Sequence, residues 1–475
     1  MDDNEKNPAF SENPEPLINK EKKMEEKTFK VKLITTISLI VVIFIILIIM
    51  LCFIFNSSDK ENYIKAKYFI ENPTNNTLLF QESYLNSIET IKIDGKTIGK
   101  NNLHNFTKEG NYIIEIYFKN ELTSLDSFFF KANTLLEVDL SNFISDKIQT
   151  TSEMFHNCHN LVKINFNNFK TSKIYNISNM FLGCSSLTSI DLSLFKNDVL
   201  KDIYGLFSGC KKLSTINLEK FNTKNVINMS SLFNDCNSLK EINLNNFITD
   251  NVIDMSKMFY GCSFLTSINL DKFKTSKVTD MFGMFDGCVS LKSLNLNNFD
   301  TKNVENMYFM FARCVSLNSL NIQNFDTSNI LDMYGMFENC KSLEKIDISH
   351  FDISKVEDMG DMFGYCSSLK EVNLKNLNPE NLFYMTGMFQ NCTNLESIDM
   401  SSFNTKNLVD ISYLLNGCIN LKLIDFRQFN TLNVIKHDDF YIGLPEVGKM
   451  IYNSNIFSKD LINLFPKGWT LEDIN

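Results

Sequence analysis

Eleven of the twelve cysteines in this 475-residue chain recur with one fixed 26-residue period. They are Cys158, Cys184, Cys210, Cys236, Cys262, Cys288, Cys314, Cys340, Cys366, Cys392 and Cys418. A fixed period of about 20 to 50 residues indicates one supersecondary unit per repeat, and each unit buries its apolar face against its neighbours. The spacing therefore predicts a solenoid in which each interval between cysteines is one coil.

Each repeat carries apolar residues at fixed distances from its cysteine. In one copy Leu187, Ile190 and Leu192 follow Cys184 by three, six and eight residues. The Ile-x-Leu alternation has the period of two that a strand requires, so stacked copies form a parallel sheet. Apolar residues 16, 19, 22 and 23 positions on suit a helical or irregular return. The expected fold is an α/β solenoid, leucine-rich-repeat-like, with one short parallel strand per 26-residue repeat.

The sequence also indicates where the repeats end. Ala132 stands where a first cysteine is expected, and the pattern is lost near Leu444. We therefore expect about twelve coils over residues 126–435 and a C-terminal cap over residues 436–475 that covers the open end of the core. Residues 59–125 do not repeat. Alternation around Asp94-Gly95 and over residues 111–118 predicts strands of a small β module that caps the first coil.

Residues 33–55 contain no charged residue and are long enough to cross about 30 Å of hydrocarbon as one transmembrane helix. Six lysines lie within residues 20–32 before this segment, whereas three lie within residues 60–67 after it. An excess of basic residues marks the cytoplasmic side of a span. We expect a single-pass type II protein of the plasma membrane with its repeats extracellular, or alternatively in the lumen of an endomembrane compartment.

The expected cytoplasmic tail comprises residues 1–32. It has eight acidic residues, seven lysines and three prolines, a composition typical of disordered segments. Within it, Asn7-Pro8-Ala9-Phe10 resembles the NPxF turn motif that endocytic adaptors read. A sorting signal and a turn without function are both open interpretations of these four residues.

The cysteine ladder has three interpretations. A free cysteine behaves as a small buried hydrophobe, which makes the eleven cysteines structural core residues. Disulfides between neighbouring coils are the first rival, but parallel Cβ vectors give poor disulfide geometry and eleven cysteines cannot all pair. Metal binding is the second, and only His156 and His159 lie close to a cysteine, Cys158. We favour packing and expect no metal, no cofactor and no catalytic residue.

A row of amide and acidic residues stands seven positions after each cysteine. The row is Asn165, Asp191, Asn217, Asn243, Asn269, Asn295, Asn321, Asp347, Asn373, Asp399 and Asp425. One hypothesis is a structural ladder in which amides bond from coil to coil. The other is a polar recognition stripe on the face that solenoids commonly use for binding. One row can serve both purposes.

The chain has six sequons; Asn56 lies too near the expected transmembrane helix, and the other five indicate candidate N-glycosylation sites in an exported domain. They are Asn75, Asn105, Asn176, Asn228 and Asn391. Without the tail, 48 acidic and 39 basic residues remain, so nucleic acid is not an expected ligand. The five histidines form no acid–base pairing, and no motif of a hydrolase, metalloprotease, phosphate-binding loop or dinucleotide fold is present. The sequence does not indicate an enzyme.

The recurring pattern MFxxCxSLxxINLxNFxTxNVxxM, which Met258 through Met281 follow closely, resembles the BspA-type leucine-rich repeat and its mycoplasma-lipoprotein-like subclass. That resemblance implies a non-enzymatic cell-surface protein associated with adhesion to host cells, matrix or other microbes. Two hypotheses follow. The first is a membrane-anchored surface protein that binds external protein, matrix or cell-surface ligands. The alternative is a structural coat or lumenal scaffold that acts through self-association.

Overall fold

The computed structural model describes residues 17–56, 61–73, 76–195 and 197–475. The chain divides into two compact units, residues 1–61 and residues 62–475, which are described separately. The candidate sorting motif at residues 7–10 and the sequon at Asn75 lie outside the described residues.

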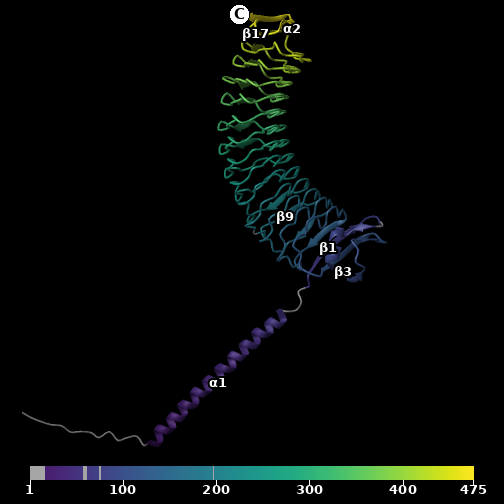
Figure 1. Ribbon diagram of the computed structural model, residues 1–475, viewed down its shortest axis with the longest axis vertical. Coiled ribbons are helices and arrows are strands. Elements are labelled where there is room, and N and C mark those ends of the chain that lie inside the picture. Colours follow the sequence, from purple (N-terminus) through teal and green to yellow (C-terminus); the bar gives the residue numbers. More distant parts are fainter. Residues whose placement is uncertain (1–16, 57–60, 74–75, 196) are drawn as a thin grey trace, which may run out of the picture. The chain divides into compact units, whose positions relative to one another are not determined.

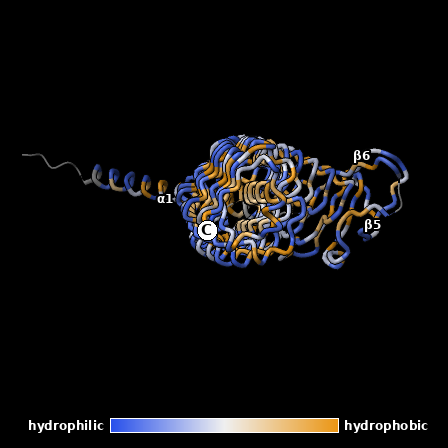
Figure 2. Tube along the Cα trace, turned by 90° about the horizontal axis from the view of Figure 1, so that it is seen from above, coloured by the Kyte–Doolittle hydropathy of each residue, from blue (hydrophilic) through white to orange (hydrophobic). Residues whose placement is uncertain are grey.

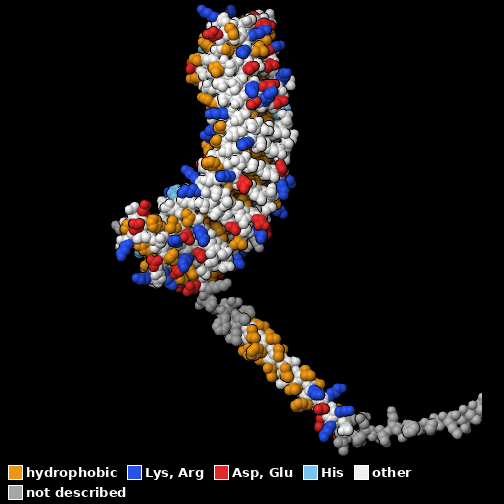
Figure 3. All heavy atoms as spheres, turned by 180° about the vertical axis from the view of Figure 1, so that it is seen from behind, with side chains coloured by type: hydrophobic (Ala, Val, Ile, Leu, Met, Phe, Trp, Pro, Cys, Tyr) orange, Lys and Arg blue, Asp and Glu red, His pale blue; other side chains and the backbone are white. Residues whose placement is uncertain are grey.

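Helix α1 (Leu17–Asn56) forms the described part of the first unit. Residues 21–50 are long and apolar enough to cross a membrane, and apolar side chains cover most of the helix (Figure 3). The helix begins sixteen residues before the predicted span, so residues 17–32 are helical rather than disordered. The sequence explains this difference, because lysine, glutamate and methionine are good helix formers and pairs such as Glu26 and Lys30 lie four residues apart on one face.

A β module opens the second unit. Strands β3 (Ile88–Ile93) and β4 (Lys96–Ile98) form the hairpin expected around Asp94-Gly95, and both turn residues have positive φ, as a type I′ turn requires. The sheet order is β4-β3-β6-β1-β7-β8, completed by β1 (Tyr63–Ile70), β6 (Gly110–Phe118), β7 (Leu135–Asp139) and β8 (Lys163–Asn165). Short elements β2 (Thr77–Leu78), η1 (Glu82–Ser87) and β5 (Leu103–His104) lie between them.

The module and the solenoid share this sheet. Strand β1 pairs antiparallel with β7, which belongs to the first coil, and β7 pairs parallel with β8 of the next coil. Because β1 occupies the open edge of β7, the first coil presents no unpaired strand there.

The solenoid has the predicted fold, with coils stacked one above another in strict 26-residue register (Figure 1). Ile190 pairs with Ile216, for example, and Ile346 with Val372. The three-residue strands after β8 are β9 (Ser189–Asp191), β10 (Thr215–Asn217), β11 (Ser293–Asn295), β12 (Ser319–Asn321), β13 (Lys345–Asp347), β14 (Glu371–Asn373), β15 (Ser397–Asp399) and β16 (Leu423–Asp425).

A second ladder runs along the return side of the coils. Single-residue parallel bridges recur once per coil from Ser124 to Lys436, at the eighteenth position after each cysteine. Between the two ladders, the return segment of each coil is a series of turns. Of the two predicted forms of this segment, helical and irregular, the structure has the irregular one. Backbone N–H groups there alternate in direction: Phe155 donates to Met180 in the next coil, and His156 donates to Glu153 in its own coil.

The core runs without a break through the coils, as the apolar interior of the trace in Figure 2 shows. Its centre is a stack of phenylalanine rings with centroids 5.5–5.8 Å apart and interplanar angles of 1–11°. The rings belong to Phe129, Phe155, Phe181, Phe207, Phe233, Phe259, Phe285, Phe311, Phe337, Phe363 and Phe389.

A threonine ladder joins coils at the thirteenth position after the cysteine, where eight of the eleven cysteines are followed by threonine and Cys184 is followed by Asn197. Thr275 is buried, and its Oγ1 donates to the carbonyl of Asp300 at 2.8 Å and accepts from the N–H of the same residue at 2.8 Å. Thr223, Thr249, Thr301 and Thr405 make the same pair of bonds. Ile353 and Pro379 occupy this position in two consecutive coils.

The C-terminal segment contains β17 (Val447–Tyr452), α2 (Lys459–Ile462) and β18 (Gly468–Asp473). Strand β17 continues the 26-residue register, since Ile424 pairs with Met450 and Leu444 stands where the next cysteine would be. Residues expected to be a non-repeating cap therefore begin with one further coil in register. Strand β18 then pairs parallel with β17 and ends the sheet.

Candidate functional site: the strand face of the solenoid

The strand face comprises the outward side chains of the short parallel strands. In β9, Ser189 and Asp191 are exposed, whereas Ile190 between them and Leu192 after them are buried. The same alternation recurs in the other coils because of the 26-residue repeat, and where neighbouring strands pair, as β9 with β10 and β11 with β12, each residue pairs with its equivalent in the next coil. The polar row predicted from the sequence therefore lies in one line on this face.

The polar row closes a turn at the end of each strand. The Oδ1 atom of Asp191 accepts the backbone N–H of Ser193 at 2.8 Å, and that of Asn321 accepts the N–H of Gln323 at 3.2 Å. Bonds to Ser193 hold the pKa of Asp191 below its usual range, and the corresponding bonds to Ser349 lower the pKa of Asp347. Between coils, Asn165 Nδ2 donates to Asp139 Oδ1 at 3.0 Å.

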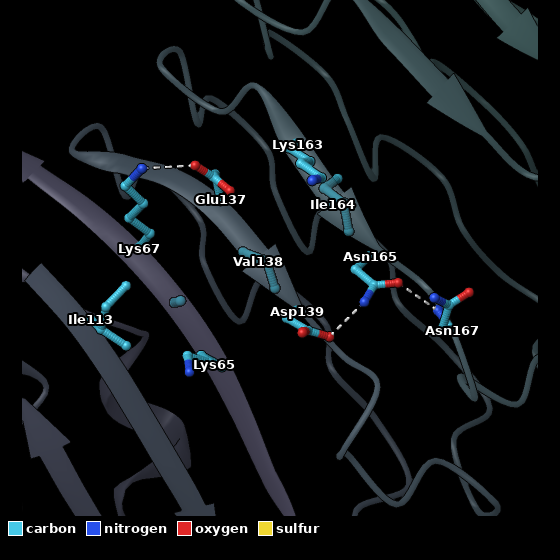
Figure 4. A pocket seen from close by; sticks show the side chains of 11 residues that line it. Lys65, Lys67, Ile113, Glu137, Val138, Asp139, Lys163, Ile164, Asn165 and Asn167 are labelled. Carbon is cyan, nitrogen blue, oxygen red and sulfur yellow. Dashed lines mark hydrogen bonds and ion pairs between the residues drawn. The ribbon is translucent and has the colours of Figure 1, made fainter. Parts of the chain in front are cut away.

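The first groove on this face lies where the β module meets the solenoid (Figure 4). It has a volume of about 440 Å³ and is lined by residues of β1, β6, β7 and β8. Lys67 Nζ lies 2.9 Å from Glu137 Oε1, and Lys65 Nζ lies 3.7 Å from Glu115 Oε1. Lys163, which also lines the groove, is exposed. The repeat pattern identified Asn165 here, but it could not identify the lysines of β1, because tertiary pairing alone brings them to β7.

Two further regions continue along the face. A second groove of about 470 Å³ runs over Ile164, Ile190 and Ile216 and their polar neighbours. Farther along, exposed charges alternate between coils. Lys345 Nζ lies 3.1 Å from Glu371 Oε2, and Lys370 Nζ lies 2.9 Å from Glu344 Oε2. Exposed pairs of this kind add little stability, so their side chains are available to a partner at small cost.

The eleven cysteines of the ladder are free thiols in the buried core. Each Sγ donates to the carbonyl of a phenylalanine 29 residues earlier, at 3.0–3.2 Å. Burial raises the pKa of every one of these thiols, to about 12 for Cys262. A thiol held protonated and out of solvent is a poor nucleophile and a poor metal ligand.

The histidines beside Cys158 are engaged separately. His156 Nδ1 lies 3.8 Å from Glu153 Oε2, and His159 Nδ1 lies 2.9 Å from the carbonyl oxygen of Gly183. Within the described ranges, no group of three or more histidine, cysteine, aspartate or glutamate residues is placed to hold a metal ion.

The sequons occupy different environments. Asn105 is exposed, and its Oδ1 accepts the N–H of Asn76 at 2.6 Å. Asn176 and Asn228 are half-buried in the bridge ladder, where each accepts the N–H of its own sequon serine. Asn391 is half-buried with a φ of 56°. The exposed Asn105 is the most accessible of these four side chains.

Comparison with solved structures finds several similar chains, two of which come from the following complexes. One is the complex of TLR13 with ssRNA13, at 16% sequence identity and a TM-score of 0.22, covering 74% of this chain and 52% of that chain. The other is the complex of Toll with Spatzle from Drosophila, at 15% identity and a TM-score of 0.23, covering 69% of this chain and 48% of that chain. The chain thus spans about half the length of these structures. No curated protein matches.

The family model described as "Mycoplasma protein of unknown function, DUF285" matches five overlapping segments: residues 101–189, 123–241, 188–292, 254–372 and 344–454. The segments begin in the β module and end after the last cysteine of the ladder, so they include every coil described above. Because they span well over half of its length, the chain belongs to the DUF285 family.

Proposed function

We propose that this protein is a membrane-anchored recognition protein whose strand face binds external protein, matrix or cell-surface ligands. The observation that carries the proposal is that inward and outward residues of each strand have different roles. The inward residues and the turn-closing Oδ1 atoms fix the backbone, and the outward side chains at positions four, five and nine vary from coil to coil. A rigid frame with variable outward residues is a typical recognition surface of solenoid proteins.

The character of the face favours many weak contacts over one dominant epitope. Its outward residues include Ser189, Thr215, Ser293 and Ser319 in the first half and alternating lysines and glutamates in the second half. Aromatic and arginine side chains, which dominate tight protein interfaces, are rare on it. Contacts repeated along several coils add their free energies when one partner spans them.

We further propose the type II topology, with the repeats outside the cell. The apolar segment of α1 supplies the anchor, and the excess of lysine before it supports a cytoplasmic N-terminus. The BspA-type subclass and the adhesive role that it implies are part of this proposal.

The binding role is testable with the full-length protein displayed in nanodiscs. Ser189→Lys, Thr215→Lys and Ser319→Lys together place bulky charge along the strand face, and binding to cells or matrix should fall by about tenfold or more. Asn225→Lys, Asn303→Lys and Asn381→Lys form the control, because these exposed positions lie near the return ladder. Each amide donates a hydrogen bond to the preceding coil, so unreactive ladder thiols must verify that the control variant is folded. Equal binding by both triple variants would contradict the proposal. Concentration-dependent self-association without any other ligand would favour the scaffold alternative.

Topology has a separate test. Epitope tags at each terminus should be labelled in intact cells only at the C-terminus, and tags at both ends should be labelled after permeabilisation. An N-terminal tag accessible in intact cells would overturn the type II orientation.

A further inference from the structure

A row of aromatic rings lies on the return side, away from the strand face. Phe282, Tyr308 and Tyr334 stand at the twentieth position after their cysteines in three successive coils, and all three are half-buried. The ring centroids of Phe282 and Tyr308 are 5.4 Å apart, and those of Tyr308 and Tyr334 are 5.2 Å apart and stacked. Phe309 meets both tyrosines edge-on, at 4.3 and 5.5 Å. Four aromatic rings thus form one half-exposed surface.

The N-terminal end of this row already holds cations of the chain. Lys257 Nζ lies 4.8 Å from the ring centroid of Phe282, and the guanidinium carbon of Arg313 lies 5.5 Å from that of Tyr260. Within about 6 Å of an aromatic centroid, a cation is attracted by the negative face of the ring. Arg313 is also fixed by Asp286, which its Nε and Nη2 atoms contact at 2.7 Å.

The C-terminal end of the row carries carboxylates instead. Asp332 Oδ1 accepts the backbone N–H of Tyr334 at 2.8 Å, and Asp358 Oδ1 and the Tyr334 ring both lie beside Gly360. Burial raises the pKa of Tyr308, and the negative charges of Asp332, Asp358, Glu338 and Asp361 raise it further. Tyr334 donates to Asp361 Oδ2 at 2.5 Å. Among the residues that the structure describes, no lysine, arginine or histidine forms an ion pair with any of these four carboxylates.

These seven residues, Tyr308, Phe309, Tyr334, Asp332, Glu338, Asp358 and Asp361, are named here the aromatic–acidic patch. Burial raises the pKa of each of the four carboxyl groups, and repulsion between them adds to the effect at Asp358 and Glu338. Arg313, which is bound to Asp286, opposes the shift at Glu338 only in part. A cation from a partner would supply positive charge beside these four carboxylates, with which no described cation of the chain forms an ion pair.

The ring of Phe309 is positioned by the coil that follows it. Its φ is 57°, in the left-handed region, which is the ordinary conformation of this repeat position, since Lys257 (55°) and Asp361 (48°) share it. The equivalent residue of the next coil is Gly335. The Phe309 ring lies directly over Gly335, where an added Cβ would come within 2.1 Å of Phe309 Cε1. The close approach to a glycine keeps the ring beside Tyr334.

We propose that the aromatic–acidic patch binds a basic polypeptide segment of a partner, with lysine or arginine side chains over the tyrosine rings and their N–H groups donating to Glu338 and Asp361. Aromatic faces combined with carboxylates suit ammonium and guanidinium groups, which gain cation–π attraction and charge-assisted hydrogen bonds together. The four carboxylates are spread over two successive coils, which suits a segment carrying more than one cation. This second surface is distinct from the strand face.

The test uses full-length protein in nanodiscs of uncharged phosphatidylcholine and a fluorescein-labelled octa-arginine peptide as the probe. Glu338→Gln with Asp361→Asn should weaken binding by about tenfold, because two charge-assisted contacts are lost. Tyr308→Ser with Tyr334→Ser should weaken it by about three- to tenfold. Serine occupies this position at Ser178, Ser230 and Ser256, so the repeat accommodates it.

The matched control is Glu344→Gln with Glu371→Gln, which removes the same formal charge from the strand face and should change affinity by less than about twofold. Unreactive cysteines in every variant verify the fold, because unfolding exposes the thiol ladder. The proposal is overturned if wild type does not bind the peptide, if the tyrosine variant binds like wild type, or if the control loses as much affinity as the patch variants. The triple-lysine variant of the strand face separates the two proposals, because it should retain its affinity for the peptide.

Discussion

At the scale of single residues, the recurrent side chains act mainly as hydrogen-bond partners for the backbone. The cysteine thiols donate to phenylalanine carbonyls, and the amide and acidic residues after the strands accept N–H groups. An alanine or a valine is as apolar as cysteine but could not donate a hydrogen bond. The need for a hydrogen-bond donor explains why cysteine, a residue better known for its reactivity, recurs at a position that solvent does not reach.

Replacing one core cysteine should reveal this role. In Cys288→Ala the thiol that donates to Phe259 at 3.2 Å is lost and a small cavity remains. We expect a destabilisation of about 1–2 kcal/mol, measured as a lower urea midpoint. Cys288→Ser restores a donor, so its midpoint should lie above that of the alanine variant if the hydrogen bond matters. An alanine variant as stable as wild type would contradict this account.

Asp358 should make stability depend on pH. Burial, with repulsion from Asp332, Asp361 and Asp410, raises its pKa from 3.8 to about 6, although Gly360 N–H opposes the shift. Because the pKa of Asp358 is higher in the folded than in the unfolded protein, protonation of Asp358 favours the folded state. This contribution to the free energy of unfolding is fully present below about pH 3.8 and is lost as pH rises through about 6.

Asp358→Asn should therefore stabilise the protein at pH 7.5 by about 1 kcal/mol or less, allowing for solvent screening of this half-buried group, and should have little effect near pH 3.5. Asparagine keeps the acceptor for Gly360 and stands at the equivalent position in Asn306. Thermal unfolding of both proteins at the two pH values checks the sign of this change in stability. Stabilisation only at the lower pH would contradict it.

At the scale of elements, the strand ladder was predictable and the return side was not. The Ile-x-Leu alternation predicted strands such as β9 and β10 because side-chain period follows directly from strand geometry. Spacings of three and four on the return are shared by helices and successive turns. What decides between them is the direction of the backbone N–H groups, which donate alternately within a coil and to the next coil.

The candidate site was predictable to a similar extent. The row of Asn165 and its equivalents could be placed on one face from register alone. The groove beside β1 and the aromatic–acidic patch required knowledge of which distant residues meet. In addition, Tyr308 and Phe309 depart from the repeat consensus, so they cannot be identified from the recurring positions.

The threonine ladder gives a prediction at this scale. Thr275→Val removes a hydroxyl that both donates to and accepts from Asp300, and leaves those part-buried backbone groups without that partner. A cost of about 1–3 kcal/mol is expected, with faster amide exchange at Asp300. Thr279→Val is the control, because Thr279 is less buried and contacts its carbonyl partner at 3.5 Å. Similar effects of both substitutions would argue against the ladder.

At the scale of the whole molecule, register is the property that holds the solenoid together. The single-residue bridge recurs at successive coil interfaces from Ser124 to Lys436, and the strand pairs and ring contacts that form between coils keep the same 26-residue spacing. Stability in such an array is approximately a sum of coil and interface contributions, so whole coils are exchangeable units.

Deleting one whole coil should therefore be tolerated. Removing residues 237–262 takes out one full repeat and joins equivalent positions, so the protein should remain folded with its remaining ladder thiols unreactive toward Ellman's reagent. Removing 237–261 shifts the register by one and turns inward residues outward beyond the junction. Equal thiol protection in the two deletions would show that register is not the controlling feature.

The interruption of the threonine ladder at Ile353 and Pro379 has a mechanical consequence. In the proposed function the ligand pulls on a chain that is held at its other end, and coils in a row bear that tension in series. Two consecutive interfaces, those following Ile353 and Pro379, lack the paired threonine bonds found at Thr275 and Thr301. The earlier interruption, at Asn197, affects a single interface. Under force the double interruption should therefore open first, while the coils before it stay closed.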